Sequence, residues 1–397
     1  MDRNFADRMS RVHKSFIREI LKVTQDPSII SFAGGLPNPA SFPVLEVSEA
    51  AVSVLKEDGK DALQYSTTEG YLPLREYIAN RYARRGLRVT PDQVLITSGS
   101  QQGIDLTGKI FINKGDTVLV ERPTYLATLQ SYGLYEPRFS AIPLEEDGPD
   151  LGALEQGLAG DVKLFYAVPN FQNPSGITYS LAKRQAVAKL LEEAGTAFVE
   201  DDPYGEIRFM GEDLPPVKAF MEESVLLGTF SKTVSPGLRL GWIVGPRDVM
   251  EKIVVAKQAT DLHTNYFTQR VVHRYLTDNE VEAHIGKIKA LYREQRDRMV
   301  AAIEAHFPPD VRYTRPEGGM FLWVTLPEGL SSLELFDQAL RENVAFVPGK
   351  AFFADGGGDN TLRLNYTNSD VDMIDVGIER LGNAIRKLLA RQPYASH

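Results

Sequence analysis

A lysine stands shortly after an apolar stretch of the chain, where its side chain could react with a carbonyl compound. Residues 225–227 are apolar, Gly228-Thr229-Phe230-Ser231 follows, and Lys232 comes next. Lysine seldom lies near a protein core, because its ammonium group must then leave water. Burial and neighbouring cations lower the pKa of such a lysine and make its amine a nucleophile for carbonyls. An exposed turn lysine is the alternative, and for a lysine taken singly it is the commoner case.

Two carboxylates follow another apolar stretch. Asp201 and Asp202 come after residues 197–199 and Glu200. Acidic side chains beside a core are costly unless a cation or a metal meets them. A helix cap or a solvated loop explains them equally well. If the strand continued, the two side chains would point to opposite faces.

A glycine turn offers a place for an anion. Ser98-Gly99-Ser100-Gln101-Gln102 follows the apolar residues 94–97 and leads into a helical pattern. The first turn of a helix exposes backbone N–H groups and the positive end of the helix dipole. Taken alone, the segment is better explained as an ordinary capped helix. Polar residues also follow residues 164–168, in the segment Asn170-Phe171-Gln172-Asn173.

The elements that must position these residues are short apolar runs that alternate with helical segments. Unbroken runs of this length are typical of strands buried on both faces of a sheet. The clearest helix is expected at 182–194, with Ser180 as its cap, Gly195 as its stop and one face formed by Val187, Leu190, Leu191 and Ala194. This alternation predicts an α/β layer with a mostly parallel sheet. Ligands bind outside the carboxyl ends of the strands in such sheets. The runs lie at 94–97, 118–120, 164–168, 197–199, 225–227 and 240–244.

The remainder of the chain predicts a smaller α+β domain. Residues 246–305 have a helical pattern, and a final helix is expected at about 373–390. Strands are expected at 321–324, 344–347 and 361–364. The first residues hold an amphipathic helix around 15–24 and the turn-rich segment Gly34-Gly35-Leu36-Pro37. We therefore expect a large domain at 46–285, a small one at 286–397, and a segment 1–45 that joins the small domain.

Composition excludes several classes of function. The chain of 397 residues carries a formal net charge of −9 without a basic stripe, which argues against nucleic acid and anionic membrane surfaces as partners. It has no cysteine, and its six histidines include no pair at metal-ligand spacing, so we expect no metal site. Neither an apolar signal segment nor a membrane-spanning run is present, which makes the cytoplasm the expected location.

Together these segments resemble the class I and II aminotransferases, which are fold-type I pyridoxal-phosphate enzymes. Within that family the chain is most similar to the branch of 2-aminoadipate (LysN-type) and kynurenine aminotransferases. The resemblance covers nearly the whole chain and implies a mostly parallel seven-stranded sheet with helices on both faces. Besides the four strand ends, it includes Ser31-Phe32-Ala33-Gly34-Gly35-Leu36-Pro37, Gln64-Tyr65-Ser66, Gly70-Tyr71, Gly318-Gly319-Met320-Phe321, Phe346-Val347-Pro348-Gly349 and Asn360-Thr361-Leu362-Arg363-Leu364.

The resemblance implies roles around the ring of pyridoxal 5'-phosphate. Lys232 would hold the cofactor aldehyde as a Schiff base and, once freed by substrate, carry a proton as a general base. Asp201 would pair with the pyridine N–H, while Tyr204 and Asn173 would hydrogen-bond the phenolic oxygen. Tyr125 would stack on the ring, although a core or interface tyrosine explains it as well.

The same resemblance implies a phosphate site. Ser100 and Gln101 would meet the phosphate at the helix start. Thr229, Ser231 and Arg239 would supply hydroxyls and a fixed positive charge. Family members usually carry serine where this chain has Thr229, so the resemblance implies that the hydroxyl and its role are kept.

Further residues are implied for the substrate and for a second subunit. Arg363 would clamp the substrate α-carboxylate, with Gly35 and Asn173 beside it. Tyr65 would reach the phosphate of the neighbouring subunit, because family active sites lie at a dimer interface. Arg18 would meet a distal carboxylate of the substrate. A solvated helix arginine is an equal alternative for Arg18.

The expected activity is therefore transamination by a homodimer with shared active sites. An amino acid, either 2-aminoadipate or an aromatic or branched-chain one, would donate its amino group to a 2-oxo acid, with 2-oxoglutarate as the expected acceptor and ping-pong kinetics. A lyase or decarboxylase using the same cofactor is an alternative. So is a non-catalytic regulator, although such proteins carry an additional winged helix. A nicotinamide enzyme is disfavoured, because no Gly-x-Gly-x-x-Gly segment opens a strand–helix turn.

Overall fold

The computed structural model describes residues 5–10, residue 20 and residues 26–391. Apart from Ile20, the helix expected at 15–24 lies outside the described residues, and so does Arg18. Within the described part, no helix has both the length and the apolar composition needed to cross a membrane.

The larger sheet confirms the predicted mostly parallel layer. Its neighbours from β8 to β4 are parallel, whereas β9 is antiparallel to both of its partners. The resemblance implied seven strands, and the eighth is the two-residue β5, which extends the edge beside β4. In spatial order the strands are β2 (Val94–Thr97), β9 (Gly241–Val244), β8 (Val225–Thr229), β7 (Ala197–Asp201), β6 (Val162–Ala167), β3 (Thr117–Arg122), β4 (Arg138–Glu145) and β5 (Gly148–Pro149).

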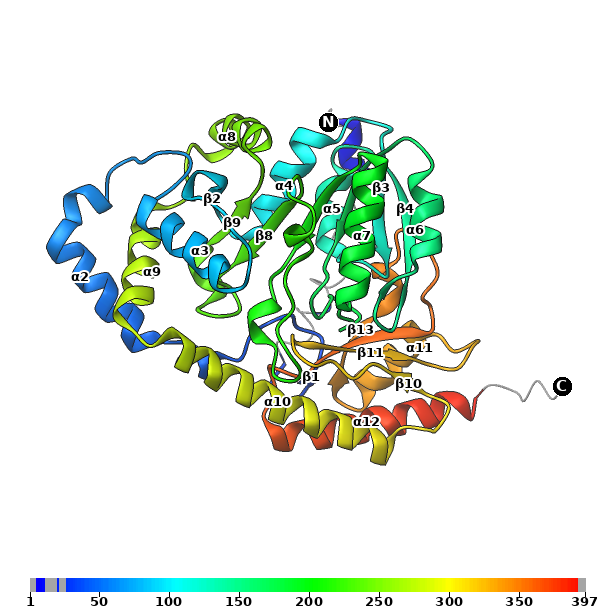
Figure 1. Ribbon diagram of the computed structural model, residues 1–397. Helices are drawn as coiled ribbons and strands as arrows, with labels where there is room; N and C mark the ends of the chain where they lie inside the picture. The colour runs from blue at the N-terminus through cyan, green and yellow to red at the C-terminus, as the bar shows by residue number, and fades with distance from the viewer. Residues whose placement is uncertain (1–4, 11–19, 21–25, 392–397) are drawn as a thin grey trace.

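Helices cover both faces of this sheet (Figure 1). Val118 and Val120 of β3 pack in one apolar cluster with helix residues such as Leu106, whereas Leu119 packs in another with residues such as Val187. Burial on both sides explains why these strands are continuously apolar. The helices are α2 (Val44–Ala62), α3 (Leu72–Arg84), α4 (Ser100–Phe111), α5 (Leu126–Gly133), α6 (Leu151–Leu158), α7 (Leu181–Ala194), α8 (Arg247–Asp261) and α9 (Tyr266–Asp278).

Helix α7 begins and ends as its sequence predicts. The side chain of Ser180 accepts a hydrogen bond from the backbone N–H of Lys183, and Gly195 adopts the left-handed conformation with φ 63°. The buried face differs slightly from the expected one, because Ala188 is buried and Ala194 is exposed.

The smaller sheet is antiparallel, with the order β10-β11-β14-β13. Its strands are β10 (Arg312–Tyr313), β11 (Phe321–Thr325), β13 (Val347–Pro348) and β14 (Thr361–Asn365). The run expected at 344–347 is divided, because β12 (Val344–Ala345) pairs with β1 (Ile30–Ser31) while β13 pairs with β14.

Three helices accompany the smaller sheet: α10 (Val281–His306), α11 (Ser332–Arg341) and α12 (Val371–Leu389). Figure 1 shows α10 and α12 side by side along the lower edge of the molecule. Because α10 runs unbroken through residue 285, the expected division of the chain into domains stays a proposal. Short 3-10 turns lie at Asp7–Ser10, Pro39–Ser41, Pro91–Gln93, Gly205–Ile207, Val217–Ala219, Pro236–Leu238 and Gly349–Phe352.

Candidate active site

A cavity of about 380 Å³ lies where β7 and β8 end, as expected for ligand sites in such sheets. Residues from both sheets and from the N-terminal segment meet there. The cavity is also lined by Leu126, Gln130, Val168 and Phe321, which we did not predict as site residues. The predicted residues that line it are Gly35, Ser100, Gln101, Tyr125, Asn173, Asp201, Tyr204, Thr229, Ser231, Lys232, Arg239 and Arg363.

Lys232 projects into this cavity three residues after β8. Its ammonium nitrogen Nζ donates a hydrogen bond of 3.2 Å to the carbonyl oxygen of Gly35. Burial, followed by the positive charges of Arg363 and Arg239, lowers the pKa of Lys232 to about 8. About a tenth of the amine is therefore neutral at pH 7 and about half at pH 8, and the neutral amine is the form that attacks carbonyls.

Asp201 is the last residue of β7 and is almost completely buried. Its Oδ2 accepts a hydrogen bond of 2.6 Å from the hydroxyl of Tyr166, whereas its Oδ1 is buried without a partner. Burial raises the pKa of Asp201 to about 7, and no cation is among the causes. An unpaired buried acceptor facing a cavity fits the N–H of a protonated pyridine ring.

Asp202 lies outside this cavity, as strand alternation predicts. Its carboxylate accepts hydrogen bonds from Asn170 Nδ2 at 2.8 Å and from the backbone N–H of Gly205 at 2.9 Å. Arg85 lies 3.7 Å away. These contacts show a structural carboxylate that holds the turn after β7.

Two tyrosines, Tyr125 and Tyr204, line the cavity. The hydroxyl of Tyr204 hydrogen-bonds the side chain of Asn173, and burial raises its pKa. Burial also raises the pKa of Tyr125 to about 12, so both phenols stay protonated at neutral pH and can donate hydrogen bonds. Tyr125 directly precedes α5, and its side chain lines the cavity.

The turn between β2 and α4 has the geometry of an anion site. Gly99 precedes the helix with φ 77° and ψ 164°, a conformation that is essentially reserved for glycine. A Cβ atom at this position would come within 2.6 Å of Arg239 Nη2. Glycine therefore lets the guanidinium of Arg239 approach the first N–H groups of α4, at Ser100 and Gln101.

The hydroxyls before Lys232 are tied to one another. Thr229 Oγ1 lies 2.9 Å from Ser231 Oγ and 3.0 Å from the carbonyl oxygen of Leu240. The backbone N–H of Ser231 donates to Thr229 Oγ1 at 3.1 Å. Threonine at 229 thus orders the segment that leads to Lys232.

Arg363 on β14 is buried and held from two sides. Its Nη1 donates to Asn173 Oδ1 and its Nη2 to the carbonyl oxygen of Ala33, both at 2.8 Å. The guanidinium carbon lies 4.2 Å from the ring centroid of Phe321. Because Nε is buried without a partner, one donor stays available to a carboxylate in the cavity.

Two expected site residues are not brought to this cavity. Tyr65 is 78% exposed and lies against His263, with 5.9 Å between the ring centroids. Arg18 lies outside the described residues. Conversely, Tyr166 and Phe321 were missed, because each stands within an apolar strand where an aromatic residue indicates core packing. Among the residues that the structure describes, no cluster of three potential metal ligands is present.

The fold and the cavity define a cofactor-dependent transferase, and sequence comparison specifies the family. Residues 31–381 match the model of "Aminotransferase class I and II". The chain therefore belongs to the class I and II aminotransferase family.

Three relatives illustrate the similarity. The chain is 46% identical to a 2-aminoadipate transaminase of Thermus thermophilus, over 97% of each chain. A crystal structure of LysN, an alpha-aminoadipate aminotransferase of the same species complexed with N-(5'-phosphopyridoxyl)-L-leucine, matches 97% of this chain and 98% of its own at 45% identity and a TM-score of 0.91. A Pyrococcus horikoshii kynurenine aminotransferase matches 98% of both chains at 43% identity and a TM-score of 0.94.

These findings identify the protein as a pyridoxal-phosphate-dependent aminotransferase of fold type I. The unpaired Oδ1 of Asp201, the amine of Lys232 and the turn at Gly99 suit the ring, the aldehyde and the phosphate of that cofactor.

Proposed function

We propose that the protein transfers the amino group of 2-aminoadipate, or of an aromatic or branched-chain amino acid, to 2-oxoglutarate by a ping-pong mechanism. The names of the relatives, which mention aminoadipate and kynurenine, and the leucine adduct bound to one of them support this range of donors. The observation that carries the proposal is the meeting of Lys232, the unpaired Asp201 Oδ1 and Arg363 in one cavity.

The cofactor, when bound, supplies an electron sink for the bonds at the substrate α-carbon. Lys232 Nζ would bond the cofactor aldehyde and later move a proton at the α-carbon as a general base. Asp201 Oδ1 would accept the ring N–H and keep it protonated. Tyr204 and Asn173 would donate hydrogen bonds to the phenolic oxygen, and Tyr125 would cover one face of the ring.

The phosphate would lie at the start of α4. Ser100 and Gln101 offer backbone N–H groups there, and Arg239 offers a fixed positive charge. Thr229 and Ser231 would add hydroxyl contacts while holding the segment before Lys232.

The substrate would bind between Arg363 and the N-terminal segment. Arg363 is proposed to hold the α-carboxylate, because its guanidinium is fixed by Asn173 and Ala33 and keeps Nε free. Gly35 and Asn173 would border the α-carbon. Arg18 is proposed to meet a distal carboxylate.

Covalent trapping tests the cofactor role of Lys232. Borohydride reduction of the enzyme with bound cofactor should attach the phosphopyridoxyl group to Lys232, as detected by peptide mass spectrometry. Lys232→Ala should lose this attachment and nearly all turnover. An unmodified Lys232 in reduced wild-type enzyme would refute the proposal.

A donor panel tests the substrate class. Each amino acid is mixed with the enzyme without an acceptor, and release of its 2-oxo acid measures the first half-reaction. Glutamate should form only after 2-oxoglutarate is added; release of ammonia without acceptor would instead indicate a lyase. Arg18→Ala should slow 2-aminoadipate far more than leucine, and equal losses would remove Arg18 from the specificity argument.

We further propose a homodimer in which Tyr65 contacts the partner's cofactor phosphate. Large apolar side chains are exposed on α2, from its end to the first residue of α3, and on or directly after α8, which is unusual for a monomer. They are Val44, Leu45, Val52, Leu55, Leu63, Tyr65, Leu72, Val255 and Leu262. The cytoplasm stays the expected compartment, and cell fractionation tests it.

A further inference from the structure

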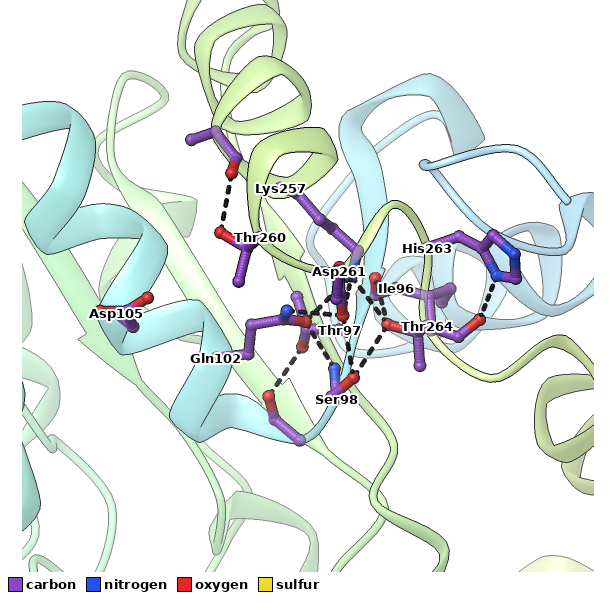
Figure 2. A network of polar contacts seen from close by, with 12 residues as sticks. Ile96, Thr97, Ser98, Gln102, Asp105, Lys257, Thr260, Asp261, His263 and Thr264 are labelled. Atoms are coloured by element: carbon purple, nitrogen blue, oxygen red, sulfur yellow. Dashed lines mark hydrogen bonds and ion pairs between the residues drawn. The ribbon is translucent and has the colours of Figure 1, made fainter. Parts of the chain in front are cut away.

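A buried lysine outside the cavity lies at the centre of a polar cluster (Figure 2). The cluster adjoins the turn between β2 and α4, Ser98–Gln102, hereafter the phosphate turn. Lys257 is on α8, and its side chain is 0% exposed. Its Nζ donates to Asp261 Oδ1 at 2.7 Å, to Gln102 Oε1 at 3.0 Å and to Thr264 Oγ1 at 3.0 Å. The three donors of the ammonium are thereby directed to three different segments.

The cluster fixes both ends of the turn that carries Gly99. Gln102 Oε1, which accepts from Lys257, also accepts from the backbone N–H of Ser98 at 2.8 Å. Gln102 Nε2 donates to Asp261 Oδ2 at 2.7 Å, and Ser98 Oγ lies 3.3 Å from the same oxygen. Ser98 and Gln102 flank the N–H groups proposed to bind phosphate, so these hydrogen bonds join the ion pair to both ends of that turn.

The same cluster extends to the segment of Tyr65. Thr264 follows His263, whose Nε2 accepts a hydrogen bond of 3.3 Å from the backbone N–H of Ser66. The ring of His263 packs edge to face on that of Tyr65. The contacts therefore continue from the phosphate turn through Lys257 and Thr264 to the residue proposed to enter the partner's site.

We propose that Lys257 is a positioning residue for cofactor phosphate in two active sites. In its own subunit it holds the Ser98–Gln102 turn in the form that presents N–H groups to the phosphate. Through Thr264 and His263 it also orients Tyr65 toward the partner's phosphate. In the ion pair Lys257 is buried and Asp261 is exposed. The net contribution of this pair to stability is small, because desolvation of the ammonium offsets the attraction, but the directed donors of Lys257 fix the geometry of the groups that accept them. This inference rests on the proposed phosphate site.

Lys257→Met tests the proposal by cofactor binding. The apparent dissociation constant for pyridoxal 5'-phosphate, measured by absorbance titration, should rise roughly tenfold or more, as loss of charge-assisted hydrogen bonds predicts. The phosphorus NMR signal of the bound phosphate should shift. Amide hydrogen exchange at Tyr65 and Ser66 should become faster.

Lys109→Met is the control for the contact between α4 and α8. Lys109 also joins α4 to α8, because its Nζ donates to Thr260 Oγ1 at 2.8 Å and lies 3.4 Å from Asp105 Oδ2. It has no contact with the turn. Its loss should leave cofactor affinity and exchange at Tyr65 unchanged. Equal effects of both variants would overturn the proposal, because they would show that only the packing of the two helices matters.

A double variant separates positioning from folding. Lys257→Met combined with Asp261→Leu removes both charges of the pair, so no unpaired carboxylate is left beside Gln102. The folded double variant should still bind the cofactor more weakly than wild type, and wild-type affinity in this variant would overturn the proposal. Two failures can be told apart. If the wild-type enzyme does not hold the cofactor at Lys232, the proposed cofactor site is wrong. If the wild type and the Lys257 variants bind the cofactor equally well, only the positioning role of Lys257 is wrong.

Discussion

Burial moves the pKa values of Asp201 and Lys232 toward 7 from opposite directions. Asp201 is raised to about 7 and Lys232 is lowered to about 8. As pH rises from 6 to 8.5, the carboxyl group ionises and the ammonium loses its proton. Both changes produce the forms that pair with a ring N–H and attack an aldehyde.

The rate of cofactor capture by the cofactor-free enzyme should therefore rise across this range in two steps, near pH 7 and pH 8. Stopped-flow absorbance measures the rate. Asp201→Asn cannot titrate, so the variant should lose the lower step and keep the upper one. Because ionisation of the free cofactor is the same in both experiments, an unchanged profile in the variant would show that the lower step does not belong to Asp201.

Tyr166 should act through Asp201. Its hydroxyl donates the hydrogen bond that occupies Oδ2 and leaves Oδ1 for the ring, and this bond lowers the pKa of Asp201 against the effect of burial. Tyr166→Phe should therefore raise that pKa further and weaken cofactor binding. A hydrogen bond to a charged group contributes about 1.5–3 kcal/mol, which corresponds to roughly tenfold or more in affinity.

The control for Tyr166 is its neighbour Tyr132. Both tyrosines are fully buried and their rings pack edge to face at 6.0 Å, but the hydroxyl of Tyr132 bonds Thr107 at 3.0 Å instead of a carboxylate. Tyr132→Phe should lower the free energy of unfolding by about 1 kcal/mol and leave cofactor affinity unchanged. If the two variants bind the cofactor equally well, Tyr166 is only a core residue.

At the scale of an element, the turn into α4 depends on glycine. Gly99→Ala places a side chain in a backbone region that costs of order 1–3 kcal/mol, and the new Cβ displaces Arg239. Removal of one hydrogen bond to the phosphate lowers affinity about tenfold, and the cofactor affinity of Gly99→Ala should fall at least that much. Titration of pyridoxal 5'-phosphate measures the loss.

Gly115→Ala is the counterpart of Gly99→Ala. Gly115 also has a positive φ, of 86°, but an added Cβ would meet no atom within 4 Å. The variant should lose stability in thermal unfolding and bind the cofactor as the wild type does. A comparable loss of affinity in both variants would mean that general destabilisation, not the contact with Arg239, is responsible.

Elements with a local signal could be predicted from the sequence, and those without one could not. Helix α7 carries its own cap and stop, and the central strands are continuously apolar because they are buried on both faces. Strand β4 was missed, since it lies near the sheet edge and mixes exposed and buried residues.

The site shows the same division. Residues within recognisable segments, such as Lys232 and Arg363, line the cavity, and their roles stay predictions. Lys257 was not predicted, because a lysine on a helix with mixed polarity has no local signal of burial. Its partner Gln102 is on another helix, so their contact exists only in three dimensions.

At the scale of the whole molecule, the cavity is completed by segments that are distant in the sequence. The carbonyl oxygen of Gly35 accepts from Lys232, which follows β8 of the large sheet, and that of Ala33 accepts from Arg363 of the small sheet. The pairing of β1 with β12 attaches this N-terminal segment to the chain directly before β13 of the smaller sheet. These contacts support the proposal that the first residues join the small domain.

Mixed dimers test whether Tyr65 serves the partner's site. In a dimer of one Lys232→Ala subunit and one Tyr65→Ala subunit, the two defects fall in the same site if Tyr65 reaches across the interface. The other site is then complete. Coexpressed mixed dimers, purified with two different tags and assayed at limiting cofactor, should recover up to about half of the wild-type activity per dimer.

The opposite result is equally definite. If Tyr65 acted within its own subunit, each site of the mixed dimer would contain one defect, and activity would stay at the level of the parent variants. Tyr65 is 78% exposed and does not line the cavity of its own chain, so a role there would require a movement that brings it across the surface. Recovery in the mixed dimer therefore tests two claims together, since it requires both a symmetric pair of subunits and a residue exchanged between them.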